Sequence, residues 1–312
     1  MTTIGRDQVA LTVTRRRRVR ARRRRGDGAS ATAFVAPSTI GLAVFTLFPI
    51  LASAWISLHN WPTIGGASFN GLHNYSQLIH DPVFRRSLLN TFVFVIVYVP
   101  LNVFVSLGLA TWLSPRIKGR HLLRVLFFLP VVTPIVANAV VWRLIYQPRG
   151  LIDSALQSTI GVHAPNFLGE HGWAMAAVIA MSVWQGFGYN MIVFSAAIEG
   201  LSQSVLDAAL MDGAGKWTTF RHVVLPLITP SIFFATTLTL ITSFQVFAQP
   251  FIMTGGGPGN DTETLVMFIY NQGFKFLSLG LASAGAWILF VIILGVSALQ
   301  FRGQRRWVNY DV

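Results

Sequence analysis

The stretch DAALMDGAGKWTTFRHVVLP, residues 207–226, interrupts a chain that is otherwise mostly apolar. It carries five charged or titratable side chains and two glycines, and it lies between two long apolar segments, residues 173–198 and 227–252. Burying charged side chains in hydrocarbon is unfavourable. The stretch is therefore a polar segment that connects two apolar ones. The composition of the whole chain indicates what the apolar segments are.

That composition is typical of a membrane protein. Of the 312 residues, 53% are hydrophobic and 11% are charged, whereas a soluble domain carries about 25% charged residues. Cysteine is absent, which excludes disulfides, thiolate metal sites and a cysteine nucleophile. The net charge of +13 arises from arginines near one end and in short loops, a distribution typical of membrane topology.

Six apolar segments are each long enough to cross about 30 Å of hydrocarbon as a helix. They are residues 34–58, 88–113, 122–145, 173–198, 227–252 and 279–301. Prolines inside them are interpreted as kinks, which membrane helices tolerate. The sequence therefore predicts an all-α integral membrane protein with six transmembrane helices.

Three regions follow from this pattern. Residues 1–30 are predicted to be a disordered polybasic cytoplasmic tail, residues 31–302 a six-helix transmembrane domain, and residues 303–312 a cytoplasmic C-terminal tail. With both termini inside, 19 of the 24 lysines and arginines fall on the cytoplasmic side and five on the outer side. Residues 207–226 are therefore predicted to be cytoplasmic.

The arginine run RRRRVRARRRR, residues 15–25, has two interpretations. It could bind nucleic acid, but a polybasic segment just before a membrane helix more often fixes orientation and contacts anionic lipid. Membrane lipid, and not nucleic acid, is the expected partner.

The polar stretch has helical periodicity, and Ser202 or Ser204 could cap its start. Gly213 permits a turn, so the pattern predicts two short helices with a bend, and Pro226 is expected to open the next span. Apolar residues recur at three, four or seven positions and would form one stripe, namely Leu206, Leu210, Trp217, Phe220 and Val224. From periodicity alone, an amphipathic loop on the membrane surface is an equal alternative.

The spacing of this stretch resembles the signature of permease subunits of bacterial ATP-driven (ABC) importers. That signature is Glu-Ala-Ala, three residues, Gly, nine residues, Ile, one residue and Leu-Pro. The matching positions here are Asp207, Ala208, Ala209, Gly213, Val223, Leu225 and Pro226, with Asp for Glu and Val for Ile. Residues 71–91, the segment LRVLFFLPVVTPIVANAVVWRLIYQPRGLID and residues 254–274 also resemble carbohydrate-type permeases, so the likeness covers nearly all of the chain beyond the tail.

The resemblance implies the type I importer permease fold, with a coupling segment at residues 199–226 between the fourth and fifth helices. It also implies that this segment docks on a cytoplasmic ATPase, with Asp207 and Arg221 setting orientation. The expected coupling residues are Leu206, Asp207, Ala208, Ala209, Leu210, Asp212, Gly213, Trp217, Arg221, Leu225 and Pro226.

The resemblance further implies a multi-pass subunit of the bacterial plasma (inner) membrane. Its expected partners are a second homologous permease, two ATPase subunits and an extracytoplasmic substrate-binding protein. No cofactor is expected on this chain, since ATP and Mg²⁺ would bind the ATPase. GAGKW, residues 213–217, lacks the earlier glycine and following Ser or Thr of a phosphate loop, and no metal or acid–base cluster is visible.

Polar and aromatic residues within the spans are the candidates for lining the substrate path, although helix packing explains each of them equally well. They are Asn138, Gln185, Tyr189, Asn190, Gln245, Phe247 and Gln249. Gln245 and Gln249 are expected to share a helix face, and amides beside aromatic rings suit a sugar or polyol. Relatives often carry an acid at the position of Ala248, so a sugar and glycerol-3-phosphate or a glycerophosphodiester both stay open.

Two other functional classes compete with the importer. One is a membrane-anchored scaffold with a lipid- or nucleic-acid-binding arginine tail. The other is an ion-coupled secondary transporter, which usually shows internal repeats or acids within its spans, and this chain has neither.

The charge distribution can be tested by labelling from outside, because the chain has no cysteine of its own. Single cysteines at Ser68, Ser158 and Gly259 are expected to react with an impermeant thiol reagent. Cysteines at Ser114 and Ser204 are expected to be protected. Protection at Ser158, or labelling at Ser204, would contradict six spans with both termini inside.

Overall fold

The computed structural model describes residues 31–62, 65–113, 119–304 and 308. The predicted N-terminal tail, residues 1–30, and most of the C-terminal tail lie outside these residues. The chain divides into two compact units, one ending at Trp55 and one beginning at Ile56. Each is described by itself below.

The described part of the first unit, residues 31–55, belongs to a single apolar helix. The helix extends over Ala31–Ser57, with a π-helical turn, η1 (Ala43–Leu47), followed by α2 (Phe48–Ser57). The turn immediately precedes Pro49, and local π adjustments of this kind let membrane helices accommodate a proline. None of the residues 31–55 is buried. A long apolar helix with an exposed surface is suited to contact with lipid.

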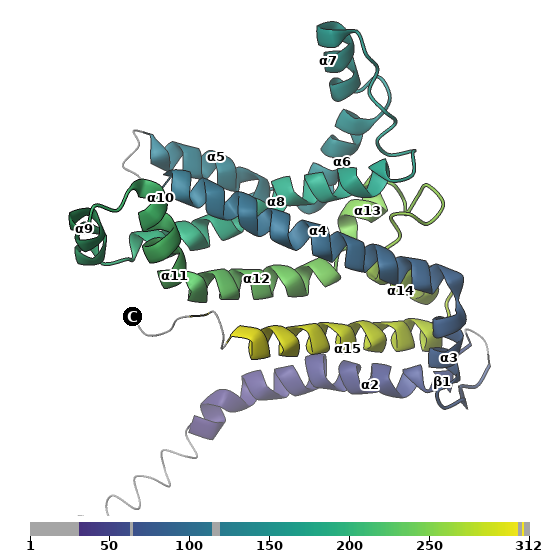
Figure 1. Cartoon of the computed structure of the whole chain (residues 1–312). Helices are drawn as coiled ribbons and strands as arrows, with labels where there is room; N and C mark the ends of the chain where they lie inside the picture. Colours follow the sequence, from purple (N-terminus) through teal and green to yellow (C-terminus); the bar gives the residue numbers. More distant parts are fainter. Residues whose placement is uncertain (1–30, 63–64, 114–118, 305–307, 309–312) are drawn as a thin grey trace, which may run out of the picture. The chain divides into compact units, whose positions relative to one another are not determined.

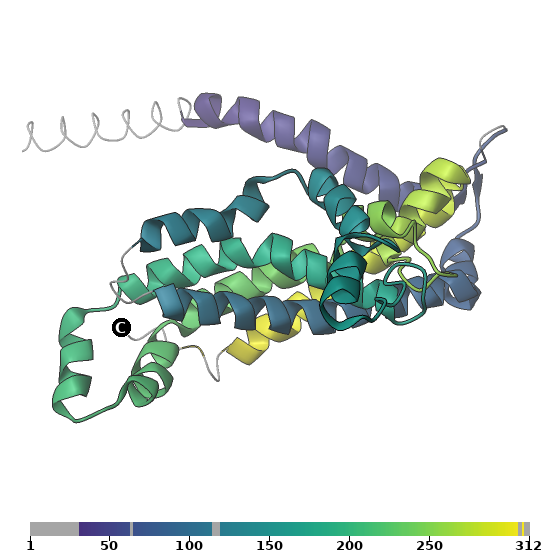
Figure 2. The same ribbon diagram turned by 90° about the horizontal axis from the view of Figure 1, so that it is seen from above.

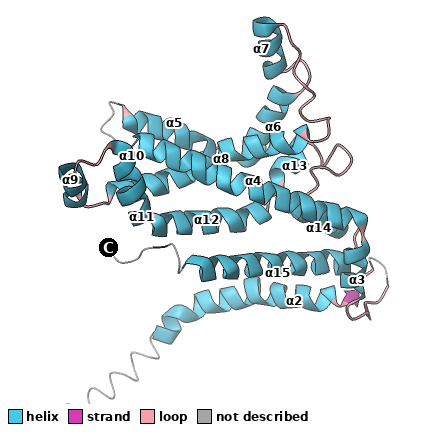
Figure 3. Ribbon diagram, in the orientation of Figure 1, coloured by secondary structure: helices cyan, strands magenta, loops and turns pink. Residues whose placement is uncertain are grey.

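The described residues of the second unit form helices, connecting loops and one short antiparallel hairpin that pairs His59 with Phe69 (Figure 3). Its first elements are β1 (His59–Asn60), β2 (Ser68–Phe69), α3 (His73–His80), α4 (Pro82–Leu113), α5 (Arg120–Val132), α6 (Ile135–Tyr146), α7 (Leu151–Ile160) and α8 (Trp173–Glu199). They are followed by α9 (Gln203–Met211), α10 (Lys216–Thr219), the π-helical η2 (Phe220–Val224), α11 (Leu225–Leu227), α12 (Thr229–Phe244), α13 (Ala248–Met253), α14 (Leu265–Tyr270), the π-helical η3 (Asn271–Lys275) and α15 (Leu279–Gln304).

Within the described ranges, four helices are long and apolar enough to cross a membrane, namely Ala31–Ser57, α4, α8 and α15. Two bent pairs bring the number to six if each pair forms one span. The pairs are Arg120–Val132 with Ile135–Ile160, and Lys216–Leu227 with Thr229–Phe244. The prediction of an all-α membrane protein is confirmed, with four to six candidate spans. The fifth predicted segment, residues 227–252, overlaps only part of the second bent pair, which begins at Lys216 and ends at Phe244.

The third span is broken, whereas the sequence predicted a kinked but continuous helix. The two helices of this pair meet at 96°, and α6 turns away from α5 at Thr133 and Pro134 (Figure 1). Pro134 has no N–H to donate to the carbonyl four residues earlier, that of Pro130. Side-chain amides replace the missing donor: Asn138 Nδ2 lies 3.1 Å and Gln185 Nε2 2.7 Å from the Pro130 oxygen.

The fifth span also differs from the expected helix, residues 227–252. A 67° bend at Ile228 precedes α12, so Pro226 lies in α11 and does not open the span. The helix then stops at Phe244 and restarts at Ala248. Pro250 could not donate to the Val246 carbonyl in a continuous helix, but it is tolerated in the first turn of a new one. Thr264 Oγ1 donates to the Val246 oxygen instead, at 2.8 Å.

Helix α8 is the centre of the second unit. In its most apolar window 61% of residues are buried, against 28% in α4 and in α15. It packs against α4 and α5 (Figures 1 and 2). Asn190 of α8 donates to Asn102 Oδ1 and to Thr239 Oγ1, each at 2.8 Å, and so joins α4, α8 and α12 inside the apolar core.

The closest approach of α5 and α8 is tested by adding one methyl group. A Cβ at Gly188 would lie 2.5 Å from the Phe127 carbonyl oxygen, whereas a Cβ at Gly108 of α4 would meet nothing within 4 Å. Gly188→Ala is expected to lower the free energy of unfolding by about 1–3 kcal/mol through overpacking. Gly108→Ala is expected to be neutral or stabilising, since Ala is the better helix former. Thermal unfolding of the detergent-solubilised proteins measures both, and equal midpoints would contradict the close packing.

Candidate functional site

The polar stretch forms two short helical pieces joined at a glycine, as predicted. Helix α9 ends at Met211, and Gly213 follows with a φ of +76°, in the left-handed region. Gly213 N donates to the Leu210 oxygen and Ala214 N to the Ala209 oxygen, each at 3.0 Å. This pair of bonds is a Schellman motif, which closes a helix and favours glycine at its left-handed position.

The start of α9 is less typical. Ser202 is the residue that precedes the helix, but its hydroxyl forms no capping bond to the backbone. The Ser202 hydroxyl oxygen lies 2.7 Å from that of Ser204 instead. Asp207 accepts a bond from Gln203 Nε2 at 2.9 Å, one turn earlier in the same helix. The Asp207 carboxylate stays exposed.

The expected single apolar stripe is wrong, because the helical pieces before and after Gly213 each carry one exposed member of it and at least one buried or half-buried member. Leu206 and Phe220 pack with Val224 against the hydrophobic core at the ends of α5 and α8. Leu210 and Trp217 point outward, with 63% and 69% of their surfaces exposed. The sequence analysis missed Met211, which is 88% exposed beside them; its place just before the helix-ending glycine was the available signal.

The remaining candidate residues of this segment differ in burial. Ala209 is buried, Leu225 and Pro226 are half-buried, and Ala208, Asp212 and Arg221 are exposed. Exposed residues of both charge signs, Asp212 and Arg221, are near Leu210, Met211 and Trp217 in the sequence. An outward apolar patch with flanking charges is the usual composition of a protein-binding surface.

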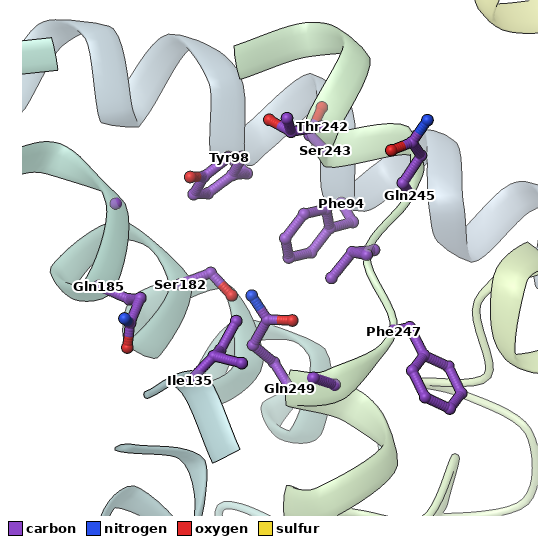
Figure 4. A pocket seen from close by; sticks show the side chains of 13 residues that line it. Phe94, Tyr98, Ile135, Ser182, Gln185, Thr242, Ser243, Gln245, Phe247 and Gln249 are labelled. Carbon is purple, nitrogen blue, oxygen red and sulfur yellow. The ribbon is translucent and has the colours of Figure 1, made fainter. Parts of the chain in front are cut away.

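A cavity of about 390 Å³ lies where the two broken spans approach α4 and α8 (Figure 4). Its walls come from α4, the start of α6, the middle of α8, the end of α12 and the break before α13. The lining residues are Phe94, Tyr98, Ile135, Ser182, Gln185, Gly186, Thr242, Ser243, Gln245, Val246, Phe247, Ala248 and Gln249. None of these described lining residues carries a charged side chain.

Four of the seven predicted path residues meet at this cavity: Gln185, Gln245, Phe247 and Gln249. Gln245 and Gln249 do not share a helix face as expected, because the helix ends between them at Phe244 and restarts at Ala248. They nevertheless line the same cavity, and Gln249 projects into it from α13 (Figure 4). The break, not helical periodicity, places both residues in the cavity wall.

The other three candidates do not line the cavity. Asn138 bonds to Gln185 Oε1 and to the Pro130 oxygen, and therefore supports the broken span. Asn190 joins three helices in the core, and Tyr189 is 45% exposed on α8. For Asn138 and Asn190 the structure favours packing.

Several lining residues were missed by sequence reasoning. Phe94 and Tyr98 are one helical turn apart on α4, and their rings stack with centroids 5.1 Å apart. Ser182 precedes Gln185 by three residues on α8, so it occupies the same face. Helical spacing from Gln185 could have identified Ser182. Phe94 and Tyr98 could not have been identified from the sequence, because their place in the cavity wall depends on how α4 packs against other helices.

Ion pairs and capping bonds stabilise the loops that are predicted to face outward. Asp153 accepts bonds from Ala164 N at 2.8 Å and Arg149 N at 3.0 Å, and the Ala164 bond is the largest cause of its lowered pKa. Burial acts to raise the pKa of Asp261, but bonds from His171 and Arg86 outweigh it and lower that pKa. In the part of the chain that the structure describes, no group of three potential metal-ligating side chains is present.

Comparison with known proteins agrees with this geometry. The family model described as "Binding-protein-dependent transport system inner membrane component" matches residues 102–309. The probable ABC transporter permease protein YurN of Bacillus subtilis is 35% identical over 275 residues, covering 86% of this chain and 94% of the relative. The lactose transport system permease protein LacF of Rhizobium radiobacter is 33% identical, covering 87% and 93%.

Another relative is the sn-glycerol-3-phosphate transport system permease protein UgpA of Yersinia pestis, 36% identical over 281 residues, covering 89% of this chain and 94% of the relative. Among solved structures, a chain of a bacterial alginate ABC transporter in complex with a periplasmic protein has a TM-score of 0.81 at 20% identity, covering 90% and 96%. That structural likeness shows the fold. These matches support neither the scaffold nor the secondary transporter.

Because the family model covers most of the chain and the relatives align over nearly all of it, this chain belongs to the binding-protein-dependent transport system inner membrane components, the permease subunits of ABC transporters.

Proposed function

We propose that the chain forms one half of the import pathway for a neutral sugar, and that the cavity between the broken spans is part of that pathway. The carrying observation is the lining of the cavity, which combines three side-chain amides with aromatic rings and no charged group among its described residues. Amides bond to hydroxyls, and aromatic faces stack on the apolar faces of sugars.

The uncharged lining favours a sugar over glycerol-3-phosphate. A phosphate is normally recognised by Arg, Lys or several backbone N–H groups, and an unpaired buried charge is strongly unfavourable. The names of the relatives allow both substrates, since one transports lactose and another sn-glycerol-3-phosphate. The chemistry of the cavity supports the first.

The proposed assembly contains a second, similar permease, two ATPase subunits and an external substrate-binding protein. The alginate transporter, solved with its periplasmic protein, supports this kind of partner. The chain itself is proposed to be non-catalytic, with ATP and Mg²⁺ on the ATPase. The lysine of GAGKW begins α10 immediately after the Schellman turn, in a segment without the phosphate-loop pattern.

The outward patch of Leu210, Met211 and Trp217 is proposed to dock on the ATPase, with Asp207 and Arg221 orienting the contact. This location requires residues 199–226 to be cytoplasmic, as the distribution of basic residues predicts. The same distribution supports cytoplasmic termini and a lipid-contacting arginine tail in the plasma membrane.

The sugar site is tested with Gln245→Leu and Gln249→Leu in the assembled complex. Each variant is expected to raise the KM for uptake roughly five- to thirtyfold, because a lost hydrogen bond to a buried polar group costs about 1–2 kcal/mol. Basal ATP hydrolysis should persist. Gln147→Leu is the matched control, since Gln147 is exposed at the end of α6 and outside the cavity.

The identity of the cargo needs a competition experiment. An excess of sn-glycerol-3-phosphate is expected not to inhibit sugar uptake by the parent complex. Uptake of radiolabelled sn-glycerol-3-phosphate would overturn the neutral-sugar proposal, and normal sugar KM values in both Gln variants would remove the cavity from the pathway.

Docking of the coupling segment on the ATPase is tested by substituting Gly213 and, as a control, Gly215. Gly213 has a φ of +76°, which costs an ordinary side chain about 1–2 kcal/mol and a β-branched one more. Gly215 has a φ of −69° and open space around its Cα. Gly213→Val is therefore expected to reduce co-purification of the ATPase, whereas Gly215→Val should retain it.

Charge reversal gives a second measure of the same contact. Asp207→Lys should weaken ATPase binding, while Lys275→Ala, on the side predicted to be outside, should not. Normal ATPase association and normal stimulated hydrolysis in both Gly213→Val and Asp207→Lys would contradict docking by this segment.

A further inference from the structure

Helices α5 and α8 are attached to each other at three levels. At one end, Gln185 Nε2 donates to the Pro130 oxygen at 2.7 Å and to the Thr133 oxygen at 3.2 Å. In the middle, Gly188 lets the backbone of α8 approach that of α5 at Phe127. The third attachment is ionic and lies at the start of α5 and the end of α8. The two helices are therefore antiparallel and in contact along α5.

The ionic attachment joins Glu199, the last residue of α8, to two arginines of α5. Arg124 Nη2 lies 2.5 Å from Glu199 Oε1 and Arg124 Nη1 3.3 Å from Oε2, so the guanidinium holds both carboxylate oxygens. Arg120 Nη1 adds a longer contact of 3.4 Å to Oε1. A two-pronged Arg–carboxylate pair fixes orientation as well as distance.

Stability alone is a weak reason for this arrangement. The side chain of Arg124 is 17% exposed and that of Glu199 37% exposed, and partly exposed ion pairs contribute about 1 kcal/mol or less. Arg124 Nε is also buried without a hydrogen-bond partner among the described residues, which is unfavourable. The ion pair therefore contributes more to the relative orientation of α5 and α8 than to the stability of the protein.

The Arg124–Glu199 ion pair lies next to the coupling segment. Glu199 is followed within four residues by Gln203, where α9 begins. Leu123, next to Arg124, packs in the same hydrophobic cluster as Leu206 and Phe220 from the inner face of the coupling segment. The start of α5 is thus attached to that segment by an ion pair and by apolar contact.

The other end of α5 lies at the cavity. Ile135, directly after the break in the third span, lines it, and so does Gln185, whose amide holds the broken end of α5. Residues of α8 line the cavity directly, but Ile135 can follow a displacement of the coupling segment only if α5 moves with α8. The Arg124–Glu199 pair is the ionic contact between α5 and α8 that lies next to the coupling segment.

We propose that Arg124 and Glu199, assisted by Arg120, are positioning residues that make α5 and α8 move as one strut between the coupling segment and the cavity. This inference rests on the proposed docking of the coupling segment on the ATPase. With the pair broken, the Gln185 and Gly188 contacts still join the helices near the cavity, but the start of α5 is held to the coupling segment by apolar contact alone. ATP hydrolysis then continues while the cavity wall at Ile135 moves less.

The test uses the full complex in proteoliposomes, with uptake and ATP hydrolysis measured on the same sample. Glu199→Gln and Arg124→Gln are expected to lower the substrate imported per ATP hydrolysed by at least about fivefold, the lower end of typical coupling between two sites. ATPase co-purification should stay normal. The reversed pair, Glu199→Arg with Arg124→Glu, is expected to recover most of the ratio, because it restores the ion pair between α5 and α8.

The matched control is another ion pair that joins distant parts of the chain. Arg86 of α4 contacts Asp261 at 2.6 Å, and neither residue belongs to α5, α8 or the coupling segment. Arg86→Gln is expected to leave the ratio of uptake to hydrolysis unchanged. An equal loss of that ratio in Arg86→Gln would overturn the strut, because any broken ion pair would then act alike.

A second measurement follows the cavity directly. A single cysteine at Thr242, an exposed lining residue, is expected to change its thiol reactivity between the nucleotide-free and ATP-bound parent. The change should disappear in Glu199→Gln while the ATPase stays bound. An unchanged response and an unchanged ratio in Glu199→Gln would overturn the strut and leave docking intact, whereas a parent that binds no ATPase would overturn docking and the strut together.

Discussion

Two carbonyl groups that lose their helical donors to proline determine how the second unit bends. Pro134 withholds an N–H from the Pro130 oxygen, and Pro250 would withhold one from the Val246 oxygen. Within a membrane such a freed carbonyl needs another donor, which a side chain can supply. Asn138 and Gln185 satisfy the first carbonyl and Thr264 the second. Both breaks contribute walls to one cavity, so the cavity exists because two spans do not continue.

The features that the sequence predicted are those with local causes. Long apolar runs predict membrane helices because each run alone must satisfy its backbone in hydrocarbon. Gly213 predicts a turn because only glycine takes a left-handed backbone at little cost, and its φ of +76° agrees. The agreement of the coupling stretch with a family signature extended this local reasoning to the family, which the comparisons then confirmed.

The features that could not be predicted depend on partners far away in the chain. Asn190 bonds to Asn102, 88 positions earlier, and nothing near either residue distinguishes such a pair from two ligand-binding amides. Gln245 and Gln249 were placed on one helix face because four-residue spacing normally gives that result. Helix termination by Pro250 competes with this spacing, and which effect prevails depends on whether Thr264 is available to the freed carbonyl.

The uncharged lining of the cavity has an electrical consequence. If the proposed neutral sugar is the substrate, its transfer moves no net charge through the membrane, and the free energy of that transfer does not depend on the transmembrane potential. A substrate with one negative charge would instead face about 2.3 kcal/mol per 100 mV when entering a cell that is negative inside.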